Sequence, residues 1–339
     1  MKENADREIM AAVYNGDYEA AKTALDKGAD PNAVGFGGYS VLGMAVEKNA
    51  EEITALLVER GAKIDPSDTK HSQVLINAIK KGNASIAMEL IKAGADINAC
   101  DLDFNTPLIL AIDKNENKMA EKLLEAGADI KIRNADKNTP FLQAVYKGSF
   151  DMISALLKAG ADINEKGAGR KSALMAAVEK EDVELVKFLI KAGADVNVTD
   201  MDGNSPLINA AIKGNVNIVK EILRAGGDVN HKGLGNYTPL LFAVENEHMD
   251  VLKELISAGA DKNAENNDGE TPIIIAVKRG KLKMVAILAN AGADINARDL
   301  NGNTALMISA ERKNIKIAKE LLENGADPMI KDSRKNSVL

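Results

Sequence analysis

The sequence predicts an all-α fold built as a solenoid, in which short helix-turn-helix units stack and hairpin-like loops project between them. Two observations predict it. A glycine recurs every 33 residues in ten copies, at Gly28, Gly61, Gly94, Gly127, Gly160, Gly193, Gly226, Gly259, Gly292 and Gly325. A second signature, Thr or Ser followed by Pro and an apolar residue, keeps the same register at residues 106–108, 139–141, 205–207, 238–240 and 271–273. A fixed period of this length is typical of repeat proteins.

The first helix of each unit is expected to begin at the second signature. Its Thr or Ser hydroxyl is a typical N-cap, and Pro is favoured in the first helical turn. After Ser205 and Pro206, residues 207–212 form an apolar run that predicts a short buried helix. Residues 213–215, which include a Gly, predict the turn that ends this helix.

The second helix follows directly and is amphipathic. In residues 217–224 the apolar side chains recur at helical spacing, and Gly226 can supply the left-handed conformation that ends many helices. Asp228 and Asn230 begin a stretch of turn-forming residues, which predicts a hairpin-like loop. Two helices this short cannot bury both apolar faces alone, so stacked neighbours are expected to share one continuous core.

These elements make the chain resemble the ankyrin-repeat family, whose unit has a T-P-L-H-x-A signature. Residues 106–111 read Thr-Pro-Leu-Ile-Leu-Ala and match it apart from the His. The resemblance implies a single domain, residues 1–339, with units near 1–34, 35–67, 68–100, 101–133, 134–166, 167–199, 200–232, 233–265, 266–298 and 299–331 and a partial unit at 332–339. It also implies a non-enzymatic protein that binds protein partners on a concave face, lined by the loop tips and the first helices.

The His of the family signature is absent from every unit. Its place is taken by Met10, Gly43, Ile76, Ile109, Leu142, Met175, Ile208, Leu241, Ile274 and Met307. The change predicts that apolar packing has replaced the polar link that the His makes in the family, and it carries no catalytic meaning.

A second regularity has twice the period of the first. The turn between the two helices holds Gly in the odd units, at Gly16, Gly82, Gly148, Gly214 and Gly280, but Asn49, Asn115, Glu181, Glu247 and Lys313 in the even units. Where this turn requires a positive φ, Glu or Lys costs on the order of 1 kcal/mol relative to Gly. The even units are therefore predicted to be the less stable ones.

Composition argues against several classes of protein. One Cys cannot form an intrachain disulfide, and one Cys with three His makes a structural zinc site very unlikely on ligand count. The net charge of −7 argues against non-specific nucleic-acid binding, and the chain has no run of about 18 apolar residues to span a membrane. The polar start shows no signal peptide, so a cytoplasmic location is expected, or a secreted or exported one if a leader has been removed from this chain. The chain is expected to be a monomer.

No motif points to catalysis, and no metal or cofactor is predicted. Residues 166–172 look like a phosphate-binding loop, but they lack its Gly before Lys and its four-residue spacer. The His residues occupy unrelated positions, and none has a Ser or Cys partner at a suggestive spacing. Cys100 is expected to be a free thiol without a role.

Exposed aromatic and apolar side chains are the best candidates for contacting a partner, because such residues anchor protein interfaces. The aromatic residues Tyr18, Phe141, Phe150 and Phe188 are expected to face the core. The candidates in the loop tips are Phe36, Tyr39, Leu102, Phe104, Met201, Leu234 and Tyr237, and those on the open side of the first helices are Tyr146, Lys147, Ile212, Lys213 and Phe242. Packing between neighbouring tips is the alternative interpretation.

A nearly continuous basic row runs just before the turn between the helices. It consists of Lys48, Lys81, Lys114, Lys147, Lys180, Lys213, Arg279 and Arg312, and in the even units an acidic residue stands before it. The row is either an ordinary solvated edge or a stripe matched to a partner of alternating charge.

The predicted function is a non-enzymatic scaffold for protein-protein interaction. One alternative is the targeting portion of a larger effector or toxin whose active domain lies elsewhere, which the abrupt end at Leu339 suggests. Another is an elastic spacer without a specific partner. Uniform tips would favour the spacer, but the tips of this chain vary.

Overall fold

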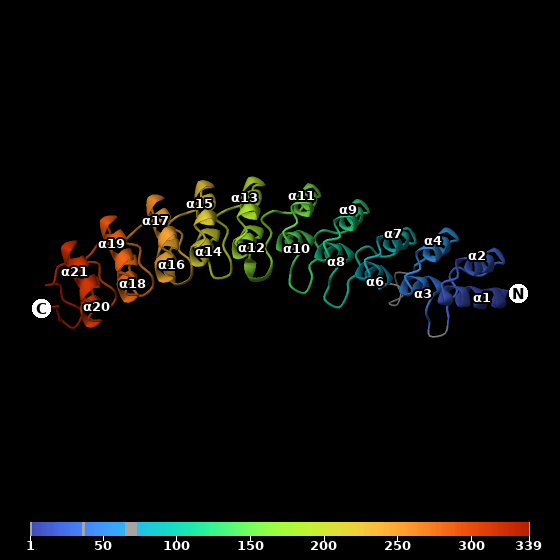
Figure 1. Ribbon diagram of the computed structural model, residues 1–339, viewed down its shortest axis with the longest axis horizontal. Coiled ribbons are helices and arrows are strands. Elements are labelled where there is room, and N and C mark those ends of the chain that lie inside the picture. Colours follow the sequence, from blue (N-terminus) through green and yellow to red (C-terminus); the bar gives the residue numbers. More distant parts are fainter. Residues whose placement is uncertain (1, 36–37, 65–72, 339) are drawn as a thin grey trace. The chain divides into compact units, whose positions relative to one another are not determined.

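The computed structural model describes residues 2–35, 38–64 and 73–338 (Figure 1). All regular secondary structure in these residues is helical, apart from isolated antiparallel bridges such as the one that joins Lys166 to Ser172. The prediction of an all-α fold of helix-turn-helix units is therefore confirmed. None of the helices in the described ranges is long and apolar enough to cross a membrane.

The chain divides into two compact parts, each made of several of the 33-residue repeats. Met1–Asp162 is called the first unit and Ile163–Leu339 the second unit from here on, and the 33-residue elements are called repeats. The helices of the first unit are α1 (Lys2–Asn15), α2 (Tyr18–Asp26), α3 (Val41–Glu47), α4 (Glu51–Glu59), α6 (Val74–Lys80), α7 (Ala84–Lys92), α8 (Pro107–Asp113), α9 (Asn117–Glu125), α10 (Pro140–Lys147) and α11 (Phe150–Lys158).

The second unit continues the alternation of a short first helix and a nine-residue second helix. Its α-helices are α12 (Ala173–Glu179), α13 (Val183–Lys191), α14 (Pro206–Lys213), α15 (Val216–Arg224), α16 (Pro239–Glu245), α17 (Met249–Ser257), α18 (Pro272–Lys278), α19 (Leu282–Asn290), α20 (Ala305–Glu311) and α21 (Ile315–Glu323), and its 3-10 turns are η1 (Ala168–Arg170) and η2 (Leu234–Asn236).

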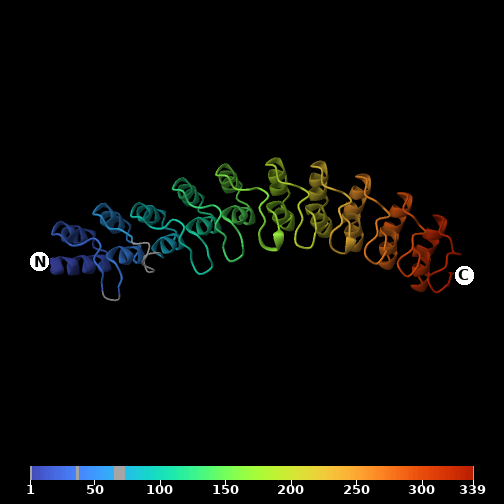
Figure 2. The same cartoon turned by 180° about the vertical axis from the view of Figure 1, so that it is seen from behind.

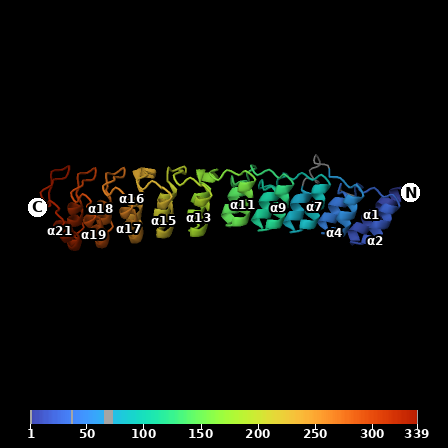
Figure 3. The same cartoon turned by 90° about the horizontal axis from the view of Figure 1, so that it is seen from above.

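Within each unit the helices form two layers. Consecutive first helices pack side by side, as α8 does against α6 and α10, and the second helices form the other layer (Figure 2). Each loop runs from the end of a second helix to the start of the next first helix. The first helices lie between the second helices and the loop tips, as Figure 1 shows. All tips of a unit project along one side (Figure 3).

The first helices begin where the sequence predicts. The hydroxyl oxygens of Thr106, Ser172 and Ser205, for example, accept the backbone N–H three residues further on, at 3.2–3.3 Å. Pro follows the cap in α8 and α14 and lacks the N–H that would otherwise be unpaired there. The cap and the Pro together fix the register of each first helix.

The core lies between the two layers of each unit. Most of the side chains that replace the family's His are buried there, among them Ile109, Leu142 and Ile208, so apolar packing has taken the place of the polar link in these repeats; Met10 and Met307 in the two terminal repeats are half-buried. Of the aromatic residues predicted in the core, Phe141 is fully buried. The prediction is wrong for Phe150, which is 37% exposed because it opens α11 at the edge of its layer, and Tyr18 and Phe188 are half-buried.

At seven junctions an Asn side chain, which sequence analysis did not single out, ties one repeat to the next, whereas the equivalent position of the fourth repeat holds Lys131. In the second unit the Asn197 side chain accepts the backbone N–H of Asp228 at 2.9 Å and donates to the carbonyl of Gly226 at 3.2 Å. The same acceptor role falls to Asn32, Asn98, Asn164, Asn230, Asn263 and Asn296. The helix ends of one repeat thus find hydrogen-bond partners in the preceding repeat.

The turn between the two helices has the backbone conformation that the sequence pattern implied. Gly214 has φ 80°, and Glu181, Glu247 and Lys313 have φ 55°, 66° and 56° at the equivalent position. A side chain with a Cβ is strained in this left-handed region. The strain therefore lies in the even repeats, as predicted.

Replacing Lys313 by Gly should raise the free energy of unfolding by about 0.5–1 kcal/mol. The left-handed conformation costs a residue with a Cβ about 1–2 kcal/mol, and the greater freedom of Gly in the unfolded chain offsets part of the gain. The urea midpoint measures the change. As a control, Gly in place of Lys319 inside α21 should lower the free energy of unfolding by about 1 kcal/mol. An equal loss on replacing Lys313 would show that the backbone of Lys313 is not strained.

Candidate functional site

Six of the described loop tips are built around a carboxylate or amide at their first residue, whereas Gly35, Gly167 and Gly233 occupy this position in three others. The Asp200 side chain accepts the backbone N–H groups of Asp202 and Asn204 at 3.0 and 2.9 Å. Asp101, Asn266, Asp299 and Asp332 hold their tips in the same way. The side chain takes the part that strand pairing plays in a regular hairpin, so each of these tips has one defined shape.

Neighbouring tips are also joined through their backbones. In the first unit the N–H of Ala135 donates to the carbonyl of Asp103 at 2.8 Å. In the second unit Met201 donates to Gly169 and Leu300 to Asp268, at 2.9 and 3.1 Å. Contact between neighbouring tips is therefore real at the level of the backbone.

The side chains at the second position of the tips point to solvent instead. Leu102 is 99% exposed, and Met201, Leu234 and Leu300 are each more than 60% exposed. A buried leucine or methionine contributes about 1.5–3 kcal/mol to folding, and these residues forgo nearly all of it. The tips thus present rows of apolar side chains on a fixed backbone.

Phe104 combines exposure with backbone strain. Its side chain is 61% exposed, and its φ is +59°, in the left-handed region that an aromatic residue rarely occupies. The equivalent position of other tips holds Gly203, Gly269 and Gly302, with φ between 71° and 77°, or the polar residues Lys137, Arg170 and Asn236, with φ between 60° and 63°. The fold therefore gains neither packing nor backbone energy from this phenylalanine.

The remaining candidates lie at different depths. Tyr39 is exposed, whereas Tyr146 and Ile212 are half-buried, and Phe36 lies outside the described residues. Tyr237 is also half-buried: its ring lies 4.8 Å from that of Phe242, and its hydroxyl accepts the Asn266 side-chain N–H at 3.2 Å. Burial raises the pKa of Tyr237. The Tyr237 side chain therefore stabilises its tip through these contacts and is also partly exposed on the surface.

The basic row serves mainly to join repeats. The Lys114 ammonium donates to the carbonyl of Lys80 at 2.6 Å, and Lys147 pairs with Asp113 at 2.9 Å. Arg279 pairs with Glu245, and the Lys48 ammonium lies 4.2 Å from the centre of the Tyr14 ring. In each case the cation reaches the first helix of the preceding repeat, where a positive charge near the C-terminus is favourable.

Not every member of the row is used in this way. Lys213 is exposed at the end of α14. The carbonyl of Ile212 beside it accepts from His248 Nε2 at 2.9 Å. In the following repeat, a histidine thus makes the contact to this helix end that a lysine of the row makes elsewhere. The row is therefore a set of internal contacts with exposed cations between them, and not a uniform charged stripe.

Groups able to support catalysis or metal binding are not assembled on the described surface. No cluster of three or more His, Cys, Asp or Glu that could hold a metal ion occurs among the described residues. Burial raises the pKa of the Cys100 thiol, and the charges of Asp96 and Asp101 raise it further. A thiol in this environment is protonated at neutral pH and is a poor nucleophile.

Asp101 is the most strongly held carboxylate of the tips. Burial by itself would raise the pKa of this group, but the hydrogen bonds from Lys80, Asn105 and Asp103 outweigh burial and lower the pKa below its usual value. The Lys80 ammonium lies 2.9 Å from the carboxylate. The tip that carries Leu102 and Phe104 is thereby anchored to the end of α6.

The comparisons with known proteins agree with this architecture. A family model described as ankyrin repeats, in three copies, matches residues 9–101, 75–167, 174–266 and 240–332. No curated protein matches the chain.

The pKa shift of Asp101 predicts a pH-dependent contribution to stability. Asn134 and Asn266 hold the tips of two other repeats with an amide, so Asp101→Asn should keep the backbone bonds and lose the pairing with Lys80, at a cost of about 1 kcal/mol at pH 7. Because the pKa is lower in the folded state, the difference from the wild type is present above about pH 4 and disappears as the pH falls through the folded pKa.

Urea unfolding of both proteins from pH 7 to pH 3 measures this difference. The exposed Asp103, changed to Asn, is the matched control and should leave the midpoint unchanged. A loss at Asp101 that does not shrink as the pH falls below about 4 would mean that the Lys80 pair is not its source.

Proposed function

Because the chain belongs to the ankyrin-repeat family, we propose that it is a non-enzymatic scaffold that binds partner proteins through the loop tips and first helices of its units. Ankyrin repeats are generally protein-protein interaction modules, and the family is typically non-enzymatic. The binding surface, which we expect to be concave, is the finer part of the proposal and rests on the residues of the tips.

Phe104 is the observation that carries the proposal. Other tips place Gly or a polar residue at this strained position, and Phe104 alone among the described tips places an aromatic ring there. Residues with a strained backbone are common at functional sites. An exposed aromatic ring is also the side chain that most often anchors a protein interface. With Leu102 beside it, Phe104 offers a partner an apolar contact of two large side chains.

The rigid backbone of the tips supports a binding role. Side-chain and backbone hydrogen bonds fix each tip before any partner arrives, for example from Asp101 within its tip and from Ala135 to the preceding one. A contact surface that is already ordered loses little entropy on binding. An elastic spacer would need neither this order nor exposed large apolar side chains.

Each unit supplies its own contact residues. In the first unit we propose Tyr39, Leu102, Phe104, Tyr146 and Lys147; in the second unit we propose Met201, Ile212, Lys213, Leu234, Tyr237 and Phe242, and add Leu300. The half-buried members stiffen the surface, and the exposed ones supply the contact area.

Phe104→Gly should weaken partner binding and raise stability at the same time. The substitution removes the ring and relieves the positive φ, so the free energy of unfolding should rise by about 0.5–1 kcal/mol. Loss of an aromatic anchor typically costs a complex 2 kcal/mol or more, roughly thirtyfold in Kd. The full chain is used to capture proteins from an extract of the source organism; a captured protein is then purified and its Kd measured.

Lys137→Gly is the matched control, because Lys137 occupies the same position of the next tip with φ 63°. It should give a similar gain in stability with an unchanged Kd. If Phe104→Gly leaves the Kd unchanged, the tip that carries Leu102 and Phe104 is not a contact site. The substitutions Met201→Ser and Leu300→Ser apply the same test to the second unit.

A further inference from the structure

One first helix lacks a side chain that the others have. Gly43 in α3 stands where Ile76, Ile109, Leu142 and their counterparts bury a large apolar group. Its backbone is helical, and a Cβ placed on it would meet only the Ser40 hydroxyl oxygen, at 3.2 Å. The backbone conformation therefore does not require glycine here, and glycine is less favourable than Ala inside a helix.

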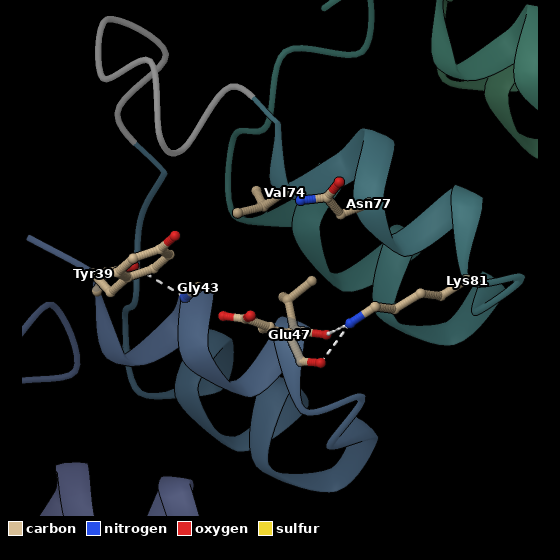
Figure 4. Close-up of a pocket in the computed structure, with 8 residues that line it drawn as sticks. Tyr39, Gly43, Glu47, Val74, Asn77 and Lys81 are labelled. Atoms are coloured by element: carbon tan, nitrogen blue, oxygen red, sulfur yellow. Dashed lines mark hydrogen bonds between the residues drawn. The ribbon is translucent and has the colours of Figure 1, made fainter. Parts of the chain in front are cut away.

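The missing side chain leaves a notch between α3 and α6. Its volume is about 290 Å³, and it is lined by Tyr39, Ser40, Gly43, Val46, Glu47, Val74, Asn77 and Lys81 (Figure 4). Val46 and Val74 form its buried apolar floor. The ring of Tyr39, the amide of Asn77 and the carboxylate of Glu47 stand around it. The notch is large enough for one long side chain.

The notch contains a carboxylate without a partner. In the equivalent position Asp113 pairs with Lys147, and Glu245 pairs with Arg279. The cation that could pair with Glu47 is Lys81, but its ammonium donates to the backbone carbonyls of Val46 and Glu47 at the end of α3. Within the described part of the chain, the Glu47 carboxylate is left with no ion pair.

The wider surroundings are negative on balance, although the Lys81 ammonium stands at the edge of the notch. Residues 1–62 contain 11 Asp and Glu against six Lys and Arg. A negative region attracts positively charged partners and speeds their approach. The notch therefore calls for a group with an apolar stem and a positive end.

We propose that the Gly43 notch binds an arginine side chain of the partner protein, a step that rests on the proposed function. The three-carbon stem of arginine would cover Val46 and Val74, and its guanidinium would reach the Glu47 carboxylate. The planar guanidinium pairs with a carboxylate through two hydrogen bonds and stacks on aromatic rings, which lysine does less well. The ring of Tyr39 and the Asn77 amide suit the same group.

The probe is the tripeptide N-acetyl-Gly-Arg-Gly-amide, titrated into the full chain while the methyl NMR signals of Val46 and Val74 are followed. These signals should shift and saturate. The peptide with norleucine in place of arginine should bind at least tenfold more weakly, and the lysine peptide should fall between the two. Equal binding of the norleucine peptide would overturn the proposal, because the notch would then select only apolar bulk.

Two variants locate the binding. Gly43→Leu restores the side chain found in α10 and α16, so the protein should fold and lose the arginine peptide. Glu47→Gln should weaken binding about tenfold, whereas Glu311→Gln, which removes the corresponding acid of α20, should not. Binding unchanged in Gly43→Leu, with folding verified by circular dichroism, would overturn the proposal.

This experiment uses no partner protein, so its outcome is independent of the test of the loop tips. If the peptide fails to bind while Phe104→Gly abolishes binding of the captured protein, the arginine notch is wrong and the scaffold stands. If the peptide binds but the tip variants retain the partner, the contact surface lies nearer to α3 than proposed.

Discussion

The hydrogen bond that an asparagine side chain accepts from the backbone N–H of the following repeat, at seven of the junctions, is the interaction on which the stacking of the repeats depends. Apolar contacts bring helix pairs together, but they allow a pair to slide or rotate. The Asn197 amide, held between the N–H of Asp228 and the carbonyl of Gly226, permits one position. Once this spacing is set, a lysine at the end of one first helix reaches the end of the previous one, as Lys114 does, and neighbouring tips come within hydrogen-bond distance.

Most of the fold could be predicted from the sequence, because its local signals are of a kind that tertiary packing does not override. A hydroxyl followed by Pro starts a helix wherever it stands, and the positive φ of Glu181 or Lys313 follows from the glycines of the odd repeats. The asparagine contacts were missed although Asn recurs at their spacing. Their partners are backbone N–H and carbonyl groups, which are present whatever the residue and so leave no pattern in the sequence. The burial of Phe150 was predicted wrongly, because the hydrophobicity of a side chain does not say how far neighbouring helices cover the first turn of its own helix, α11.

The candidate site was less predictable than the fold. The exposure of Leu102 and Phe104 follows from their place in the tips, but the half-burial of Tyr237 depends on Phe242 and Asn266 from other parts of the unit. The basic row was visible as a pattern, whereas its use depends on which atoms a flexible side chain can reach. Gly43 was visible as an exception among apolar residues, yet the cavity that it opens depends on Val74 and Asn77 of the next first helix.

The way in which the tips are held has a consequence for how such a protein can change over generations. The bonds that shape a tip involve its first residue and backbone groups. None of them involves the side chains of Leu102, Ala135, Met201 and Leu300 at the second position, although Asn267 at this position accepts a hydrogen bond from Asn236. A substitution there alters what the protein presents to its surroundings without altering how it folds. New specificities can therefore be acquired one tip at a time, and the stability of the array sets no limit on the order in which they appear.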